Sequence, residues 1–228
     1  MGFIFEDRPA ESPLIETIWQ TRSEEAGSFI STAATRFGLV VSRHQGKTTL
    51  TIRGPETVAS QADYPADVEF FGIVFKLGTF MPPLPPRMVM DRQDVNLPEA
   101  GSRSFWLQGS AWEFPTFENA DTFVERLVRQ GLLAHEPVVD AALEGQPQYL
   151  SPRAVQYRFL YATGLTQATV RQIDRARQAA ILLQQGVSIL DTVYETGYSD
   201  QSHLTRSLRR FMGQTPLQVA QLDRLNPG

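Results

Sequence analysis

The first half of the chain alternates short apolar runs with turn signals, which is the pattern of a β structure. Runs rich in β-branched residues cover 37–43 and 47–53, and the sequence His44-Gln45-Gly46 between them is typical of a hairpin. A more apolar run at 67–77 and a fourth at 104–108 predict two further strands. Turn signals separate the runs at Gly54-Pro55, at 81–86 and at Leu97-Pro98. The pattern therefore predicts an antiparallel sheet folded into a barrel or a sandwich.

The hydrophobic period changes after Glu118 from two residues to about 3.6, the period of an amphipathic helix. From 119 to 133 the apolar positions form one helical face, and Asn119 or Asp121 is available as the N-cap. Further helices are predicted at 136–143, 151–163, 169–185, 188–196 and 200–212, each ending near a glycine, with a last short helix after Thr215-Pro216. The predicted fold class is α+β, with an N-terminal antiparallel β-barrel or sandwich domain followed by an all-α domain.

Two of the predicted helices repeat each other at an offset of 49 residues. Ser151 and Asp200 are equivalent capping residues, and Gly164 and Gly213 end the two helices. The apolar positions also align, with Val155, Phe159 and Ala162 in the first helix and Leu204, Leu208 and Phe211 in the second. The opposite faces carry Arg153, Gln156, Tyr157 and Leu160 in the first helix and Ser202, Thr205, Arg206 and Arg209 in the second. Both faces are suited to contacts with base edges and phosphates.

Each repeated helix follows a shorter helix, and the second pair is joined by the tight turn Gly197-Tyr198-Ser199. Two helices joined by such a turn form a helix-turn-helix, whose second helix enters the major groove of DNA. The helix at 169–185 lies between the two pairs and would be about 25 Å long. A rod of that length can hold two recognition helices near one turn of DNA apart, about 34 Å. The sequence therefore predicts a chain that reads two successive major-groove segments.

The net charge of −4 hides two parts of opposite sign. Residues 147–228 carry nine arginines, no lysine and five acidic residues, a charge of +4, whereas residues 1–146 carry −8. The basic part suits a polyanion, and arginine favours bidentate contacts with phosphate or guanine. The chain has no cysteine, which excludes disulfides, thiolate zinc sites and thiol nucleophiles. It has no run that would span a bilayer and no signal peptide, so we expect a cytoplasmic protein with no membrane partner.

Family motifs accompany the second helix pair. They are Arg175-Ala176-Arg177, the run from Thr196 to Arg206, and Phe211, Gly213 and Thr215-Pro216, and together they resemble the AraC/XylS family of bacterial transcription regulators. The resemblance covers about the last 90 residues and implies a DNA-binding domain of two helix-turn-helix units. It also implies base-reading positions, which fall on Arg153, Gln156 and Tyr157 in the first unit and on Gln201, Ser202, Thr205 and Arg206 in the second. The N-terminal part more loosely resembles the cupin-like sensor or dimerisation domains that precede this module.

These observations divide the chain into a β-rich sensor or dimerisation domain (1–118), an amphipathic connecting helix (119–134) and a double helix-turn-helix domain (135–228). We expect Arg153, Gln156, Thr205 and Arg206 to read base edges, and Arg209, Arg210 and helix N-termini to hold phosphates. His203 lies beside the reading face and suits a phosphate contact or a capping role equally well. The first unit departs from the family pattern in its longer connection, 145–150, and in Leu160, for which packing on another element is the alternative.

The expected partners are double-stranded DNA, a small-molecule effector bound by the N-terminal domain, a second copy of the chain and, if the protein is an activator, RNA polymerase. Nine aromatic residues of the first part are candidates for an effector pocket or, more simply, for a β core: Phe70, Phe71, Phe75, Phe80, Phe105, Trp106, Trp112, Phe114 and Phe117. The apolar stripe of Phe123, Leu127 and Val128 suits either a homodimer seam or packing on the β domain.

Enzyme functions find little support in the sequence. His44, His135 and His203 are far apart and lack the HxH spacing of a metal-binding cupin. Glu113 and Glu118 could pair as acid and base, but no motif calls for it, and no phosphate-binding glycine loop is present. The absence of cysteine excludes the related repair proteins with a methyl-accepting cysteine. We expect no enzyme activity, cofactor or metal; the alternative is a small-molecule-binding or enzymatic β domain with a helical protein-association tail.

Overall fold

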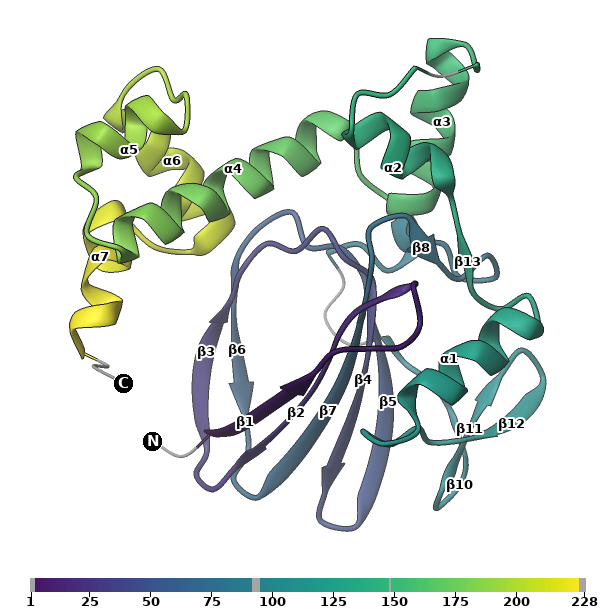
Figure 1. Ribbon diagram of the computed structural model, residues 1–228. Coiled ribbons are helices and arrows are strands. Elements are labelled where there is room, and N and C mark those ends of the chain that lie inside the picture. Colours follow the sequence, from purple (N-terminus) through teal and green to yellow (C-terminus); the bar gives the residue numbers. More distant parts are fainter. Residues whose placement is uncertain (1–2, 92–94, 148, 226–228) are drawn as a thin grey trace. The chain divides into compact units, whose positions relative to one another are not determined.

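The N-terminal half of the chain folds around an antiparallel six-stranded sheet (Figure 1). The computed structural model describes residues 3–91, 95–147 and 149–225. From one edge of the six-stranded sheet to the other, the strands are β1 (Phe3–Arg8), β2 (Ile15–Ser23), β7 (Val68–Phe75), β4 (Gly38–His44), β5 (Lys47–Arg53) and β9 (Val95–Asn96). Three smaller sheets are formed by β10 (Glu99–Gly101), β11 (Ser104–Leu107) and β12 (Ser110–Glu113), by β8 (Thr79–Phe80) and β13 (Ala134–His135), and by β3 (Gly27–Ser31) and β6 (Ser60–Tyr64).

The four strands predicted from the sequence are present as β4, β5, β7 and β11. The hairpin between β4 and β5 is also confirmed, because His44 pairs with Lys47 and leaves a two-residue loop. Both loop residues, Gln45 and Gly46, have positive φ angles of 50° and 77°. A type I′ turn requires this conformation, and its twist matches that of the flanking strands.

The expected barrel is not closed. Within the described residues, β1 and β9 are the two edges of the six-stranded sheet and do not pair with each other. Antiparallel β structure in the N-terminal part is therefore confirmed, the sheet does not close into the barrel that was one of the two expected forms, and the cupin-like resemblance stays a prediction.

The core of the β domain lies on one face of the sheet. Ile18 pairs with Ile73, Ile73 with Leu39, and Leu39 with Ile52, so that four apolar side chains form one row across β2, β7, β4 and β5. All four are at most 3% exposed. Side chains of one row lie on the same face of a sheet, and burying each aliphatic side chain stabilises the fold by about 1.5–3 kcal/mol.

Helix α1 (Ala120–Arg129) packs on this core. Phe123 and Leu127 belong to the same cluster of buried side chains as the β strands, while Val128 is 42% exposed. Two of the three stripe residues therefore pack on the β domain, which was one of the two alternatives. The helix ends four residues before the predicted end because Gly131 turns the chain with a φ angle of +68°.

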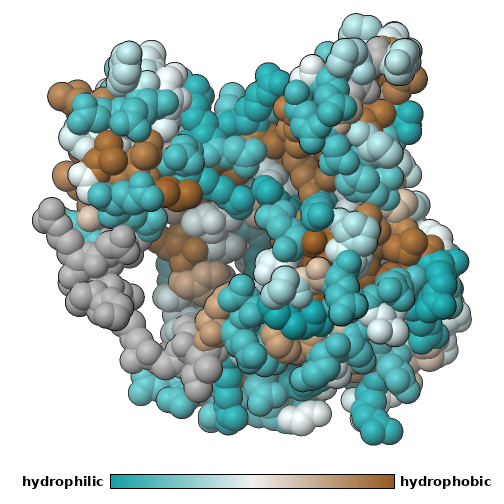
Figure 2. All heavy atoms as spheres, viewed as in Figure 1, coloured by the Kyte–Doolittle hydropathy of each residue, from teal (hydrophilic) through white to brown (hydrophobic). Residues whose placement is uncertain are grey.

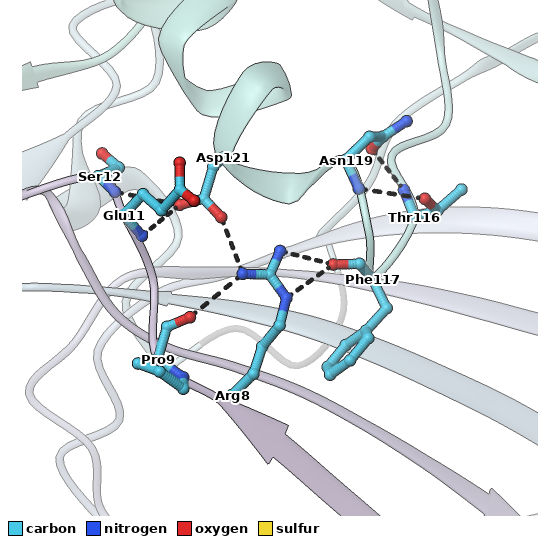
Figure 3. Close-up of polar contacts among 8 residues, drawn as sticks. All are labelled: Arg8, Pro9, Glu11, Ser12, Thr116, Phe117, Asn119 and Asp121. Atoms are coloured by element: carbon cyan, nitrogen blue, oxygen red, sulfur yellow. Dashed lines mark hydrogen bonds and ion pairs between the residues drawn. The ribbon is translucent and has the colours of Figure 1, made fainter.

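Arg8 fastens the beginning of α1 to β1 (Figure 3). Its guanidinium donates to the Phe117 carbonyl oxygen at 2.7 and 3.1 Å and to Asp121 at 2.8 Å. Burial raises the pKa of Asp121, but hydrogen bonds from Arg8 and from the N–H groups of Ser12 and Glu11 outweigh it, so the pKa is lowered. Asp121 is therefore engaged in tertiary contacts, and Asn119 occupies the N-cap position without a side-chain capping bond.

The remaining helices match the predicted ones within two residues at each end. They are α2 (Pro137–Leu143), α3 (Pro152–Thr163), α4 (Gln167–Gln184), α5 (Ile189–Glu195), α6 (Gln201–Met212) and α7 (Pro216–Leu225). No helix among the described residues is both long enough and apolar enough to cross a membrane.

The contacts divide the chain into two units that differ from the predicted domains. Unit 1 contains residues 1–28, 35–55 and 63–166, so α2 and α3 belong to the same unit as the six-stranded sheet. Unit 2 contains α4 to α7 together with the short segments 29–34 and 56–62. The predicted boundary at 118/119 follows the change of hydrophobic period, and both it and the boundary at 134/135 stay predictions.

Candidate nucleic-acid interface

The 49-residue repeat is present in three dimensions as two helices of 12 residues each, α3 and α6. The side chain of Ser151 accepts a hydrogen bond from the Ala154 N–H, and Asp200 accepts one from the His203 N–H. The two helices end at Gly164 and Gly213, with φ angles of 71° and 72°. Only a residue without a Cβ adopts this conformation at little cost, which explains the glycine at both ends.

The short helices that precede α3 and α6 repeat as well, at an offset of 52 residues. Helices α2 and α5 both have seven residues and both end in a glycine with a φ angle of +69°, Gly145 and Gly197. The N–H of the following residue bonds to the carbonyl oxygen five residues earlier, from Gln146 to Ala141 and from Tyr198 to Val193. Helices α2 and α5 therefore end with the same geometry, and the two connections differ only after that point.

On α3 the predicted outward face is exposed. Arg153, Gln156, Tyr157 and Leu160 are all exposed, and Phe159 and Ala162 are buried on the opposite side. Leu160 is 44% exposed, so it is not buried against another element. Figure 2 shows hydrophobic side chains at the surface among the polar ones in this part of the molecule.

Tyrosine stacking holds α3 within unit 1. The rings of Tyr157 and Tyr161 are stacked with centroids 6.3 Å apart, and Tyr161 meets Phe80 of β8 edge to face at 5.3 Å. Arg158 is paired with Glu136 at 2.8 Å. Tyr157 therefore presents an exposed ring that is supported from one side, while Arg158 is already neutralised by a neighbouring carboxylate.

On α6 the predicted residues divide into two groups. Gln201, Ser202, Arg206, Arg209 and Arg210 are exposed, and His203 and Thr205 are partly buried. The Thr205 hydroxyl donates to the Gln201 carbonyl oxygen at 2.8 Å, which leaves its oxygen able to accept. The His203 ring contacts the Ser199 hydroxyl at 3.2 Å and meets Tyr198 edge to face at 5.0 Å. These positions leave the assigned roles of all seven residues as predictions.

The capping carboxylate of Asp200 has a pKa below its usual value. The main cause is the hydrogen bond from the His203 N–H, and the Ser199 hydroxyl and the charge of Arg206 act in the same direction. An ionised carboxylate at a helix N-terminus is also favoured by the helix dipole. Asp200 therefore caps α6 as an anion and is not a proton donor.

The C-terminal end of α6 is held by two segments from the first third of the chain. The Ala33 N–H donates to the Phe211 carbonyl oxygen at 2.7 Å, and the Ala59 N–H donates to the Arg210 carbonyl oxygen at 2.8 Å. Arg177 of α4 in turn donates to the Ala33 carbonyl oxygen at 2.9 Å. Carbonyl groups at a helix end lack partners within the helix, so these segments complete α6. The sequence contains no signal for this arrangement.

Unit 1 contains a separate hollow of about 300 Å³ against the sheet. Its apolar lining is Val41, Phe70 and Phe71, and its polar lining includes two arginines and two carboxylates: Glu6, Gln20, Thr21, Arg22, Arg43 and Glu69. Of the nine candidate aromatic residues, only Phe70 and Phe71 line this hollow, while Phe75, Phe80, Phe105 and Trp112 are buried side chains.

The described histidines and carboxylates do not assemble a metal site. His135 binds Asp140 at 2.6 Å and Thr79 at 3.1 Å, which are contacts within unit 1. The carboxyl of Glu118 has a lowered pKa, mainly because of a hydrogen bond from Thr116. A general acid requires a raised pKa instead, so Glu118 is poorly suited to that role.

A comparison with known protein families finds a match in the C-terminal part of the chain. Residues 149–221 match the model of a family described as a helix-turn-helix domain, of the AraC type. No curated protein and no solved structure matches the chain. The match begins just before α3 and includes α6, so it spans both repeated helices. The match of residues 149–221 to a helix-turn-helix domain supports binding to DNA and regulation of transcription.

Proposed function

We propose that this chain is an AraC/XylS-type transcription regulator that reads two successive major-groove segments of double-stranded DNA. The observation that carries the proposal is the pair of 12-residue helices α3 and α6, each with a side-chain N-cap and a terminal glycine, inside the matched residues 149–221. Each follows a seven-residue helix in a helix-turn-helix arrangement. An exposed polar face on each of two such helices is the feature that DNA reading requires.

The proposed roles follow the chemistry of each side chain. Arg153, Gln156, Thr205 and Arg206 contact base edges, with Tyr157, Gln201 and Ser202 beside them on the same faces. Arg209, Arg210 and His203 contact phosphates. Arginine recognises guanine through two parallel hydrogen bonds, and glutamine recognises adenine in the same way. Phosphate contacts fix the register of the protein on the duplex but carry no sequence information.

Binding of the full chain to duplex DNA tests this function against a helical tail for protein association. The experiment is fluorescence anisotropy with a labelled random-sequence duplex, begun at low salt. We expect binding that weakens steeply with salt, since counterions are released from the DNA. A chain that does not bind the duplex at low salt would contradict DNA binding and favour the protein-association tail.

A small-molecule effector is the second part of the proposal. The hollow of about 300 Å³ in unit 1 supports it, because that volume falls within the usual range of ligand sites. Its lining combines the apolar Val41 and Phe71 with two arginines, Arg22 and Arg43, and two carboxylates, Glu6 and Glu69. Arg22 is paired with Glu69 at 3.7 Å, so the hollow suits a ligand with an apolar body and a polar group that the exposed Arg43 can bind. Thermal-shift screening of the full chain against metabolites tests this, and Arg43→Ala should remove the stabilisation by an anionic hit. A hit that stabilises Arg43→Ala equally well does not occupy this hollow.

Regulation through this domain needs no enzyme activity and no cofactor, and we propose neither. Homodimer formation and a contact with RNA polymerase are consistent with the same function. Sedimentation of the full chain with and without DNA measures the oligomeric state, and a chain that remains monomeric on its DNA site would remove the homodimer from the proposal.

A further inference from the structure

A second hollow lies in unit 2, between α4 and α6, and its lining is strongly basic. Its volume is about 230 Å³, and its polar lining consists of Gln172, Arg175, His203, Arg206, Ser207 and Arg210, with Phe211 as an apolar wall. We call it the Arg175 hollow. No carboxylate lines it among the described residues. Three arginines around one small hollow repel one another, so the site favours an anion that neutralises them.

The ring of Tyr198 organises one wall of this hollow. Tyr198 is only 5% exposed, and the Arg175 guanidinium lies over its ring at 4.4 Å. The Tyr198 and His203 rings meet edge to face with their centroids 5.0 Å apart, and the Tyr198 hydroxyl is 2.8 Å from the Ser207 hydroxyl. Tyr198 therefore fixes three of the lining side chains before any ligand arrives, which lowers the entropy cost of binding.

Arg175 is not saturated by its protein contacts. Its Nε is buried without a hydrogen-bond partner among the described residues, and its Nη1 makes a single long contact of 3.5 Å with the Gly197 carbonyl oxygen. A buried donor without a partner costs about 1–3 kcal/mol. A planar guanidinium that is stacked on an aromatic ring and has free donors is suited to the oxygens of a phosphate.

We propose that the Arg175 hollow binds a phosphate group, and that this phosphate belongs to the backbone of the bound DNA. The source of the phosphate rests on the proposed function, whereas the anion site itself rests on the geometry alone. Gln172 and Arg175 of α4 thereby join the exposed arginines of α6 in fixing the protein on the duplex. The linking helix is then part of the DNA-binding surface as well as a spacer.

A pair of charge-matched variants on α4 tests the proposal. Gln172→Glu places a carboxylate in the lining, and Gln178→Glu adds the same charge at an exposed position outside it. Neither glutamine is buried, so both variants should fold. For the full chain, we expect Gln172→Glu to flatten the slope of log K against log salt for a random-sequence duplex by about one unit, and Gln178→Glu to leave it unchanged.

Titration with inorganic pyrophosphate at constant ionic strength separates the two sources of phosphate. The wild type and Gln178→Glu should be stabilised in thermal unfolding, with an affinity at least about tenfold higher than that of Gln172→Glu, because like charges repel. Arg175→Gln should weaken pyrophosphate binding in the same way; if it unfolds, Gln172→Glu still decides.

The outcomes are distinct. Pyrophosphate binding that depends on Gln172 with unchanged salt slopes would overturn the DNA source and assign the hollow to a free phosphate ligand. Equal behaviour of Gln172→Glu and Gln178→Glu in both titrations would overturn the site itself. A wild type that binds pyrophosphate but no duplex would refute the proposed function and leave the anion site standing.

Discussion

The two helix-turn-helix units share their local structure and differ in their surroundings. Helices α3 and α6 have the same length, the same type of N-cap and the same glycine at the end. In unit 1, α3 is supported by Tyr161 on Phe80, and one of its two arginines, Arg158, is paired with Glu136. In unit 2, α6 carries three exposed arginines.

This difference predicts a division of roles between α3 and α6 in DNA binding. The exposed face of α3 offers Arg153, Gln156 and an exposed tyrosine, and so contributes little charge. The exposed face of α6 offers Arg206, Arg209 and Arg210 and lies beside Arg175. Because phosphate contacts set affinity and base contacts set specificity, α6 should supply most of the electrostatic binding energy. Duplicated local structure therefore does not imply equal contributions.

The largest expected difference between the two helix-turn-helix units concerns the packing of the helices α3 and α6. Leu204 is fully buried in α6, whereas the equivalent Val155 of α3 is only partly buried. Leu204→Ala should lower the free energy of unfolding by about 2–5 kcal/mol, and Val155→Ala by clearly less, because the smaller side chain leaves less buried volume empty. Chemical denaturation of both variants measures this, and equal losses would contradict the unequal packing.

Variants of the base-reading residues on α3 and α6 should have effects of similar size at different base pairs. Arg206→Ala should weaken binding to the preferred site by about 1–3 kcal/mol and relax specificity at one base pair. Arg153→Ala should relax specificity at a different base pair, in the other segment. Competition binding with single-base variants of the site measures both effects. Unchanged affinity of Arg206→Ala would remove that residue from the base-reading set.

Phosphate contacts should involve Arg209 and Arg210 of α6 but not Arg158 of α3. Arg210→Ala should flatten the dependence of log K on log salt by about one unit. Arg158→Ala is the matched control on α3, since that arginine is neutralised by Glu136 at 2.8 Å and should leave the slope unchanged. A slope that changes with Arg158 but not with Arg210 would reverse the proposed division.

The smallest effects concern the two N-caps, which differ in charge. Ser151→Ala should cost about 0.5–2 kcal/mol at every pH, because a serine cap does not titrate in this range. Asp200 has a lowered pKa in the folded state, so its stabilisation is present above the unfolded pKa of about 3.9 and is lost as the pH falls through the folded value.

Asp200→Asn provides the control for the acidic cap. Asparagine caps a helix about as well as aspartate and carries no charge. The variant should therefore show a weaker decline of stability below about pH 4 than the wild type. Identical acid unfolding curves would exclude Asp200 as the titrating cap.

The helical half could be predicted closely because its signals are local. Ser151, Asp200, Gly164 and Gly213 determine where α3 and α6 begin and end, whatever packs on these helices. The exposed faces of these helices could be predicted for the same reason, since the periodicity of a helix defines which positions share a face.

The strands at the N-terminus could not be predicted in this way. Strand β2 contains an irregularity between Ile15 and Thr17, so the buried residues Ile15 and Ile18 are three positions apart instead of an even number. Such spacing obscures the alternation by which a strand is recognised. The small sheet of β3 and β6 was missed as well, and Phe29 and Ile30 of β3 are exposed.

The parts of the site that depend on tertiary contacts also lay beyond the sequence. The segments at Ala33 and Ala59 reach α6 through main-chain hydrogen bonds, which any residue except proline can make. Arg175 was noted only as part of a family motif, because its relation to Tyr198 and His203 depends on how α4 and α6 pack.

Selection of bound sites from randomised duplex DNA with the full chain tests the central claim most directly. Helix α4 has 18 residues and is about 27 Å long, which suits recognition helices one turn of DNA apart. We predict enriched sites with two specified segments about 10 base pairs apart, one altered by Arg153→Ala and the other by Arg206→Ala. Recovery of a single segment that neither variant alters, or no enrichment at all, would contradict the account.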